Sequence, residues 1–571
     1  MNPGPAAILG NGSLLATMSA RGQVERLFWP SLDRGSHLGD LRFGLELDGA
    51  VEQSYLLDAN VLLSRSRDIE VVDLVPELEP VLLRRIRGRA EGGRLVVDCR
   101  PELDGISGGL AASVDGNRVV FYRRDVALAV GAVGAEAFAT GLGETQGGIS
   151  VPFDGDAVVA LAFGASSREA VARLDAALQQ DFDALVSSRI RYDAARIARA
   201  EPPHGDEVAP LYRRSLLALE LLADRDSGSV IAAPELDPQF EHSGGYGFVW
   251  GRDLAFIVLA FLAAGRDDLA KRALRWLPTA QEPEGLWLQR HWTNGSLAPS
   301  WCRHQLDETG AILFAYDAAW RRFGDETLDA DLWPSARRAA DFLLGTVDAD
   351  GLPVATADLW EEREGRHAFT AAAIVGGLRA AASMARRHDP AFAEPYEAAA
   401  EVVREAIERE LWSDFHGRYL RSLGDPVVDV SLLGLAWPFA AVEPGGERMR
   451  ATVAALQAEL GCPAGSLRRY AGDTYAGGNR WVLAGLWLGL WHRQAGEPEG
   501  LERALRYALG AQTDLGLLPE QVTDDGEPAW VVPLAWSHAM LLLAARPELE
   551  AVLNGWGQTP AVGVAAGTAR V

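Results

Sequence analysis

The chain has 571 residues, of which 48% are hydrophobic and 23% charged, and its formal net charge is -25. This length exceeds what one hydrophobic core usually organises, so we expect two or more globular domains. A surface this acidic repels phosphate backbones, which argues against nucleic acid as a partner.

Residues 1–165 have the pattern of an antiparallel β-sandwich. Short apolar or alternating runs occur at 43–47, 71–75, 80–87, 94–97, 118–123 and 157–163. Turn-forming pairs such as Asn11-Gly12 and Asp115-Gly116 separate them. Many short strands at this spacing favour two packed sheets. Residues 166–205 then change to a helical period, and we expect a linker helix there.

From residue 206 to about 550 the pattern is almost wholly helical. Apolar-periodic segments occur at 209–224, 253–265, 267–279, 304–323, 331–345, 367–387, 391–411, 429–439, 447–459, 478–495, 499–511 and 533–546. Twelve helices in pairs favour a toroid of six inner and six outer helices. A helical solenoid would give a similar pattern, but no repeat of fixed period is evident. Residues 551–571 are predicted to form a loose tail.

The N-terminal segment has no basic stretch followed by an apolar core, as a secretory signal would have. The longest clean apolar run, residues 254–264, is shorter than the roughly 20 residues that a membrane-spanning helix needs. We therefore expect a soluble, cytoplasmic protein without a membrane partner.

Two carboxylates stand out as candidates for acid–base chemistry. Glu361 lies between Trp360 and Glu362, and an aromatic wall with a neighbouring carboxylate would raise its pKa. Glu520 stands in the apolar stretch 515–522, where it could stay ionised and activate a water. Such a pair is what cleavage of a glycosidic bond requires. The same residues are also compatible with an exposed acidic helix start and an ordinary loop carboxylate.

Aromatic and polar residues gather at the predicted helix starts. Sugar rings pack on aromatic faces, and their hydroxyls bind carboxylate, amide and guanidinium groups. Such residues occur near 250–253, 301–308, 358–362, 469–475 and 536. A single Trp is typically a core residue, but this recurrence predicts that the clusters face one end of a toroid.

The chain contains, in this order, the motifs Tyr246-Gly-Phe-Val-Trp250-Gly-Arg252-Asp253, Gln305-Leu-Asp307-Glu308-Thr-Gly310, Asp358-Leu-Trp360-Glu361-Glu362, Arg469-Tyr470 with Asp473-Thr-Tyr475 and Gly478-Asn479-Arg-Trp481, Pro519-Glu520-Gln521, and Trp536-Ser537. Together and in this order, these motifs resemble glycoside hydrolase family 15, which contains glucoamylases, glucodextranases, isomaltose-cleaving glucohydrolases and some bacterial trehalases.

The resemblance implies an inverting, exo-acting α-glucoside hydrolase, built from an N-terminal antiparallel β-sandwich and an (α/α)6 catalytic toroid. It implies that Glu361 is the general acid and Glu520 the general base. The implied substrate-binding residues are Tyr246, Trp250, Arg252, Asp253, Trp301, Arg303, Trp360, Glu362, Arg469 and Trp536. The expected partner is a short α-glucan or disaccharide that yields β-D-glucose.

Two positions depart from the family pattern, and other functions stay open. Gly251 replaces a larger residue, Arg480 stands where many glucoamylases have proline, and we see no starch-binding module. These departures favour short soluble substrates. The alternatives are a trehalase or α-1,6-specific enzyme of the family, an inverting disaccharide phosphorylase, and an inactive glucan-binding protein. The chemistry demands no cofactor and the chain has no EF-hand loop, so structural calcium stays open.

Overall fold

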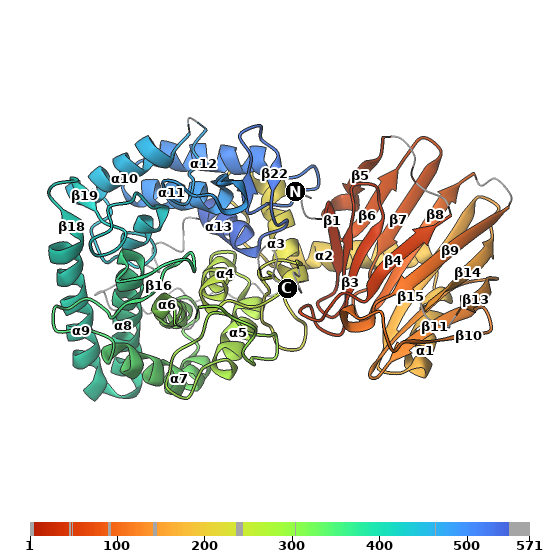
Figure 1. Ribbon diagram of the computed structural model, residues 1–571, viewed down its shortest axis with the longest axis horizontal. Coiled ribbons are helices and arrows are strands. Elements are labelled where there is room, and N and C mark those ends of the chain that lie inside the picture. The colour runs from red at the N-terminus through yellow and green to blue at the C-terminus, as the bar shows by residue number, and fades with distance from the viewer. Residues whose placement is uncertain are drawn as a thin grey trace, which may run out of the picture.

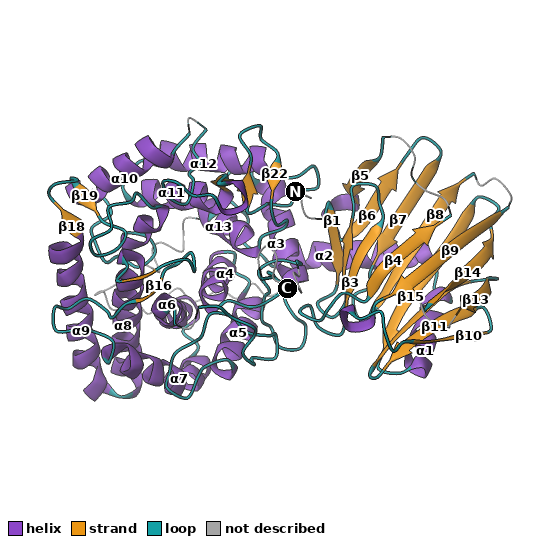
Figure 2. Ribbon diagram, viewed as in Figure 1, coloured by secondary structure: helices purple, strands orange, loops and turns teal. Residues whose placement is uncertain are grey.

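The β-sandwich lies beside a ring of helices in the computed structural model (Figure 1; Figure 2). The structure describes residues 5–44, 47, 50–89, 93–140, 145–235, 244–302, 304–462 and 464–546. The predicted combination of an antiparallel β domain and a helical toroid is confirmed. The predicted tail over residues 551–571 lies outside the described residues.

The β domain contains sheets of eight, four and three antiparallel strands, in the orders β10-β11-β12-β15-β8-β7-β6-β5, β13-β14-β9-β4 and β1-β2-β3. The strands are β1 (Ala7–Gly10), β2 (Leu15–Met18), β3 (Val24–Phe28), β4 (Leu38–Phe43), β5 (Glu52–Tyr55), β6 (Val61–Arg65), β7 (Ile69–Leu74), β8 (Val81–Gly88), β9 (Arg94–Pro101), β10 (Ala111–Asp115), β11 (Arg118–Arg123), β12 (Val126–Ala132), β13 (Glu136–Thr140), β14 (Gln146–Pro152) and β15 (Asp156–Gly164).

Five of the predicted runs coincide with β7, β8, β9, β11 and β15. The run predicted at 43–47 is displaced, because β4 ends at Phe43 and residues 45 and 46 lie outside the described residues. In β4 the side chains of Leu38, Leu41 and Phe43 enter the core, whereas the polar residues between them hid this strand from the sequence pattern.

The predicted linker helix is two helices, α1 (Ser167–Leu178) and α2 (Phe182–Ile197). Side chains of Ser166 and Asp181 cap their N-termini, as these residue types favour. Helix α1 covers the outer face of the eight-stranded sheet, so it belongs to the β domain rather than to a linker. This cover explains why β12 is buried on both faces. Only α2 runs between the two domains (Figure 1).

Eleven of the twelve predicted helical segments form α-helices. They are α3 (Ala209–Leu222), α4 (Gly251–Ala263), α5 (Asp267–Trp276), α6 (Leu306–Phe323), α7 (Glu326–Leu344), α8 (Ala368–His388), α9 (Ala393–Ala406), α10 (Glu447–Leu460), α11 (Val482–Gln494), α12 (Pro498–Ala511) and α13 (Ala535–Ala545). The inner ring is closed by successive contacts of α4, α6, α8, the short helix η6 (Val430–Leu435), α11 and α13, with α13 returning to α4.

The segment predicted as a helix at 429–439 is instead a 3-10 helix, η6 (Val430–Leu435). The chain leaves the helical path after Leu435, because the Leu435 carbonyl accepts from the amides of Ala441 and Val442 at 2.9 and 3.0 Å. Pro438 cannot extend a helical hydrogen-bond ladder. A Cβ on Gly434 would lie 2.4 Å from the Phe369 ring, so this inner position is too crowded for a larger residue.

Helix α8 is long and apolar enough to cross a membrane by composition alone, with a mean hydropathy of 1.4. In the structure, however, 89% of that window is buried inside the protein. Its apolar character therefore reflects its place in the inner ring.

Candidate active site

The N-terminal ends of several inner helices surround one cavity of about 340 Å³. Every predicted site residue except Arg303 lines it, and Arg303 lies outside the described residues. Trp250 immediately precedes α4, Trp536 lies in the first turn of α13, and residues 358–362 lie in the loop before α8. The cavity is also lined by Ala232, Gly244, Leu359, Tyr475, Trp481 and Leu534.

Arg252 forms part of the cavity wall from the first turn of α4. Its side chain is 3% exposed and donates to Asp307 at 2.9 Å, and Glu308 lies 3.7 Å away. Burial opposes the charge, but these carboxylates outweigh it and raise the pKa of Arg252. Burial also raises the pKa of Asp253 to about 7, against the lowering effect of Arg252. Arg252 and Asp253 can therefore offer both donors and acceptors to a polyhydroxy ligand.

The carboxylate of Glu308 explains why position 251 is a glycine. The Gly251 amide donates to Glu308 at 3.0 Å, and a Cβ at this position would lie 2.7 Å from the same oxygen. Burial raises the pKa of Glu308 well above its usual range. The larger residue expected from the family pattern would therefore displace Glu308.

Glu361 is held by three side chains. Trp250 donates to its Oε1 at 2.6 Å, Gln289 donates to Oε2 at 2.5 Å, and Arg252 lies 3.5 Å from Oε1. Its backbone is in the left-handed region, with φ of 65°. Burial raises the pKa of Glu361, and the nearby Arg252 and the two hydrogen bonds oppose that rise.

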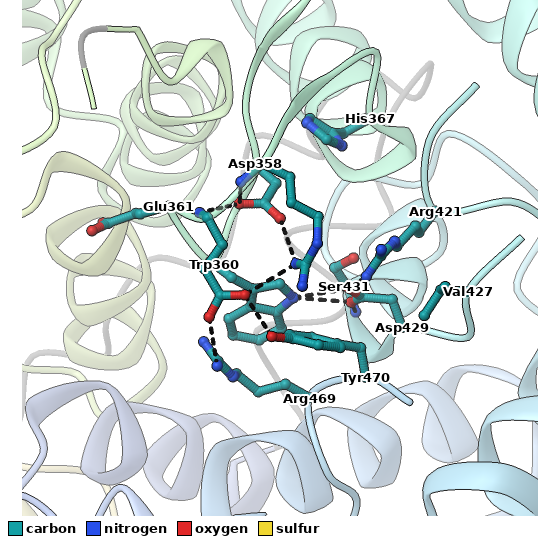
Figure 3. Close-up of polar contacts among 12 residues, drawn as sticks. Asp358, Trp360, Glu361, His367, Arg421, Val427, Asp429, Ser431, Arg469 and Tyr470 are labelled. Atoms are coloured by element: carbon teal, nitrogen blue, oxygen red, sulfur yellow. Dashed lines mark hydrogen bonds and ion pairs between the residues drawn. The ribbon is translucent and has the colours of Figure 1, made fainter. Parts of the chain in front are cut away.

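The expectation that Glu362 raises the pKa of Glu361 is wrong. Glu362 accepts from Arg469 at 2.8 Å and from Tyr470 at 2.5 Å. Figure 3 shows the Glu361 carboxyl pointing away from Arg469 and Tyr470. The left-handed backbone at Glu361 thus separates two side chains that are adjacent in sequence, and burial is the main cause of the raised pKa.

Trp360 and Arg469 form an aromatic and cationic wall on the Glu362 side. The Trp360 indole donates to Asp429 at 3.1 and 3.0 Å (Figure 3). Arg469 pairs with Asp473 at 2.8 and 2.7 Å, and its guanidinium lies 5.2 Å from the Trp360 ring centre. Both side chains are therefore fixed before any ligand binds.

Glu520 is held by two uncharged donors. Tyr246 donates to its Oε1 at 2.7 Å, and Gln521 donates to Oε2 at 2.9 Å. Burial raises the pKa of Glu520 to about 7, and these two hydrogen bonds lower it only in part. The expectation that this carboxyl stays ionised therefore holds in the empty cavity only above about pH 7.

The aromatic side chains that bind Glu361 and Glu520 lie next to each other. Trp250 binds Glu361, Tyr246 binds Glu520, and the two ring centres are 6.1 Å apart. Glu361 and Glu520, which are 159 positions apart in the chain, thus line the same cavity. Such an arrangement can deliver a proton at one point of a ligand and remove one at another.

Trp536 and Trp301 lie at different depths in the cavity. Trp536 is buried, and its ring centre is 5.9 Å from the Arg252 guanidinium. Trp301 is 51% exposed, and its indole donates to the Glu361 carbonyl at 3.3 Å. The exposure of Trp301 places it at the mouth, whereas Arg252 and Trp536 lie inside.

Sequence reasoning missed the role of Gln289, which holds Glu361 from a loop that contains Trp287 and Trp292 but does not begin a predicted helix. It also missed Asp429, because the helix expected at 429–439 would not direct it at Trp360. Tyr475 and Trp481 were part of the quoted motifs but not of the predicted site, although both line the cavity.

Within the described ranges, the structure contains no grouping of three or more His, Cys, Asp or Glu side chains suited to a metal ion. The acidic groups that line the cavity are instead paired with Arg252 and Arg469 or hydrogen-bonded by Trp, Tyr and Gln side chains.

Curated relatives match the chain over part of their length. They include an uncharacterised glycosyl hydrolase of Methanocaldococcus jannaschii (30% identical, 61% of this chain and 57% of the relative), an isomaltose glucohydrolase of Kribbella flavida (33%, 43% and 64%) and a glucoamylase of Clostridium sp. strain G0005 (30%, 48% and 39%). The chain thus spans less than two thirds of each of these relatives.

Solved structures share the fold. A bacterial glucoamylase complexed with acarbose has a TM-score of 0.82 at 20% identity, covering 96% of this chain and 94% of its own. A wild-type glycosidase has a TM-score of 0.52 at 27% identity, covering 61% of this chain and 98% of its own. The model of glycosyl hydrolases family 15 matches residues 209–508. This match spans more than half of the chain and all but one of the inner-ring helices, so the protein belongs to glycosyl hydrolases family 15.

Proposed function

We propose that this protein is an inverting, exo-acting α-glucoside hydrolase that releases β-D-glucose from the non-reducing ends of short α-glucans. The observation that carries the proposal is the placement of Glu361 and Glu520 on one cavity, each oriented by its own hydrogen bonds. The names of two relatives, a glucoamylase and an isomaltose glucohydrolase, support α-1,4 and α-1,6 linkages as the first to test.

In the proposed reaction, Glu361 donates its proton to the glycosidic oxygen as the bond to C1 breaks. Glu520 takes a proton from a water that attacks the opposite face of C1, so the product has inverted configuration. The leaving sugar departs as an alcohol, and the two carboxyls exchange protonation states until solvent restores them. The raised pKa of Glu361 supports its role as the acid.

Arg252 and Asp253 are proposed to bind the 4- and 6-hydroxyls of the terminal glucose. Tyr246, Trp250 and Trp536 would pack on the ring, and Glu362, Arg469 and Trp360 would bind near the cleaved bond. The depth of Arg252 relative to Trp301 supports action at chain ends, because the reacting sugar would occupy the inner part of the cavity.

Hydrolysis is favoured over phosphorolysis by the charges in the cavity. Arg252 and Arg469 are each paired with carboxylates rather than presented to an incoming anion. Glu520 would also repel phosphate where an attacking nucleophile must sit. A water-activating base is the role that its position supports.

The decisive experiment measures glucose release from maltose, isomaltose, trehalose, maltotriose and dextran, with and without phosphate. An NMR time course should show β-glucose first, and initial α-glucose would exclude inversion. Glu361→Gln and Glu520→Gln should each lower kcat by about 10²–10⁴. The exposed neighbours Glu364→Gln and Glu527→Gln serve as matched controls. Near-normal turnover by E361Q on a natural glucoside would refute the acid assignment.

A further inference from the structure

Gln289 belongs to a short hairpin, residues 289–298, which we call the acid-holding hairpin. One arm pairs with the segment before α4, because His291 and Val249 exchange backbone hydrogen bonds at 2.8 and 2.9 Å. The two arms join through the Ala298 amide, which donates to the Arg290 carbonyl at 3.1 Å. This hairpin therefore lies directly beside Trp250, the other side chain that donates to Glu361.

Gln289 lies at the base of the hairpin, where two backbone amides just beyond it fix the orientation of its side chain. The side-chain oxygen Oε1 of Gln289 accepts from the backbone amides of Trp301 and Cys302 at 3.1 and 3.0 Å, which directs the side-chain NH2 group to Glu361. A displacement of the hairpin along its length would therefore displace the donor to Glu361 Oε2.

The turn of the hairpin is anchored on both sides of Thr293. Its carbonyl accepts from the Trp276 indole at 2.6 Å, at the end of α5. Its amide donates to Asp33 Oδ2 at 2.5 Å. Asp33 is 5% exposed, and Ser31 holds it in place by donating to Oδ1 at 2.7 Å.

Asp33 comes from the other domain. It lies in the loop that follows β3. Strand β3 lies on the side of the sandwich next to the helical ring (Figure 1). Thr293 is 260 positions further along the chain. Thr293 lies four residue steps beyond Gln289, which corresponds to roughly 13 Å in an extended chain. One buried side chain of the β domain thus anchors the far end of the hairpin that holds Glu361.

We propose that Asp33 is a positioning residue for the reaction, because it fixes the acid-holding hairpin and, through Gln289, the orientation of Glu361. This inference rests on the proposed role of Glu361 as the general acid. It gives the β-sandwich a part in catalysis that the contents of the cavity alone do not reveal. Asp33 itself touches no substrate.

The expected signature is a shift in the pH profile. The hydrogen bond from Gln289 favours the ionised form of Glu361, so its loosening should raise the pKa of Glu361 further. An acid acts in its protonated form, so the high-pH limb of kcat/KM should move to higher pH. Arg252, Asp253, Glu308 and Cys302 also face Glu361, but they lie outside the hairpin and should stay in place. Arg290 faces Glu361 from within the hairpin and lowers its pKa, so a displaced Arg290 would raise the pKa of Glu361 in the same direction.

The test uses the full chain and compares Asp33→Ala with Asp33→Asn, which keeps an acceptor for the Thr293 amide. D33A should lower kcat by about tenfold, within the roughly hundredfold that a 1 Å misplacement can cost. Its KM should change little, and the high-pH limb of its kcat/KM profile should move to higher pH. The kcat and pH profile of D33N should stay near those of the wild type. The matched control is Asn60→Ala, which removes another buried contact between the domains, to Arg214 at 2.8 Å. N60A should lower Tm without moving the limb.

A double-mutant cycle tests whether the effect of Asp33 on Glu361 passes through Gln289. If Asp33 acts through the hairpin that carries Gln289, D33A should have a smaller effect on the pH limb in a Gln289→Ala background than in the wild type. Should D33A fail to fold, Ser31→Ala offers a milder change of the same kind. The proposal is overturned if D33A or S31A lowers Tm but leaves kcat and the limb unchanged, or if D33A and Q289A act independently. An active E361Q enzyme would instead refute the acid role of Glu361 on which this inference rests.

Discussion

Tyr246→Phe tests how the cavity sets the protonation of the proposed base. The variant keeps the aromatic ring and removes only the hydroxyl that donates to Glu520 at 2.7 Å. A hydrogen bond to a charged group contributes about 1.5–3 kcal/mol, and one pKa unit corresponds to about 1.4 kcal/mol. The pKa of Glu520, about 7 in the wild type, should therefore rise by about one to two units.

The sign follows from the role of a base, which acts only when ionised. Activity is lost as the pH falls through its pKa, so the low-pH limb of kcat/KM should move upward by the same one to two units. At pH 6 the variant should be about ten- to a hundredfold slower than wild type, and the deficit should shrink as the pH rises. Initial rates of glucose release between pH 4 and 10 measure this directly.

Two variants make the interpretation specific. Tyr470→Phe removes a similar hydroxyl from Glu362, a carboxylate that is not the proposed base, and should leave the low-pH limb in place. The Tyr475 hydroxyl lies 2.7 Å from that of Tyr246 and could turn to Glu520, so the double variant Y246F/Y475F removes this replacement. If Y246F loses activity equally at every pH, Tyr246 acts by packing or binding, and the reasoning fails.

Three further predictions concern stability. Burial raises the pKa of Glu520 from 4.5 to about 7, so the folded protein loses stability as the pH rises through this range. Glu520→Gln should therefore stabilise the fold by about 3 kcal/mol at pH 8 and have no such effect at pH 4, as measured by urea unfolding. Gly251→Ala should destabilise by about 1–3 kcal/mol through its clash with Glu308, and a smaller residue at 308 should recover part of that loss. Asp473→Ala removes the bidentate partner of the buried Arg469, which keeps its ion pair with Glu362, and should cost about 1.5–3 kcal/mol; an unchanged Tm would contradict this.

The amino-acid sequence by itself determined the two-domain plan, the helical segments of the ring and the pair of carboxylates. Helical periodicity and turn residues are local signals, so eleven of the twelve inner and outer helices were predictable. The α-helix predicted at 429–439 did not form, since Gly434 packs closely against the Phe369 ring and the Leu435 carbonyl accepts from Ala441 and Val442. Strand β4 was displaced because polar residues lie between the ones it buries.

Only the tertiary structure decided how the site is held. The left-handed backbone at Glu361 turns it away from Glu362, although the two are adjacent in sequence. Gln289 reaches Glu361 across 72 positions, and Asp33 reaches Thr293 across 260. No spacing rule connects residues so far apart, because their contact depends on the packing of whole helices and domains. Motifs can therefore name the groups that react, whereas their orientation and pKa arise from burial and from partners brought together by the fold.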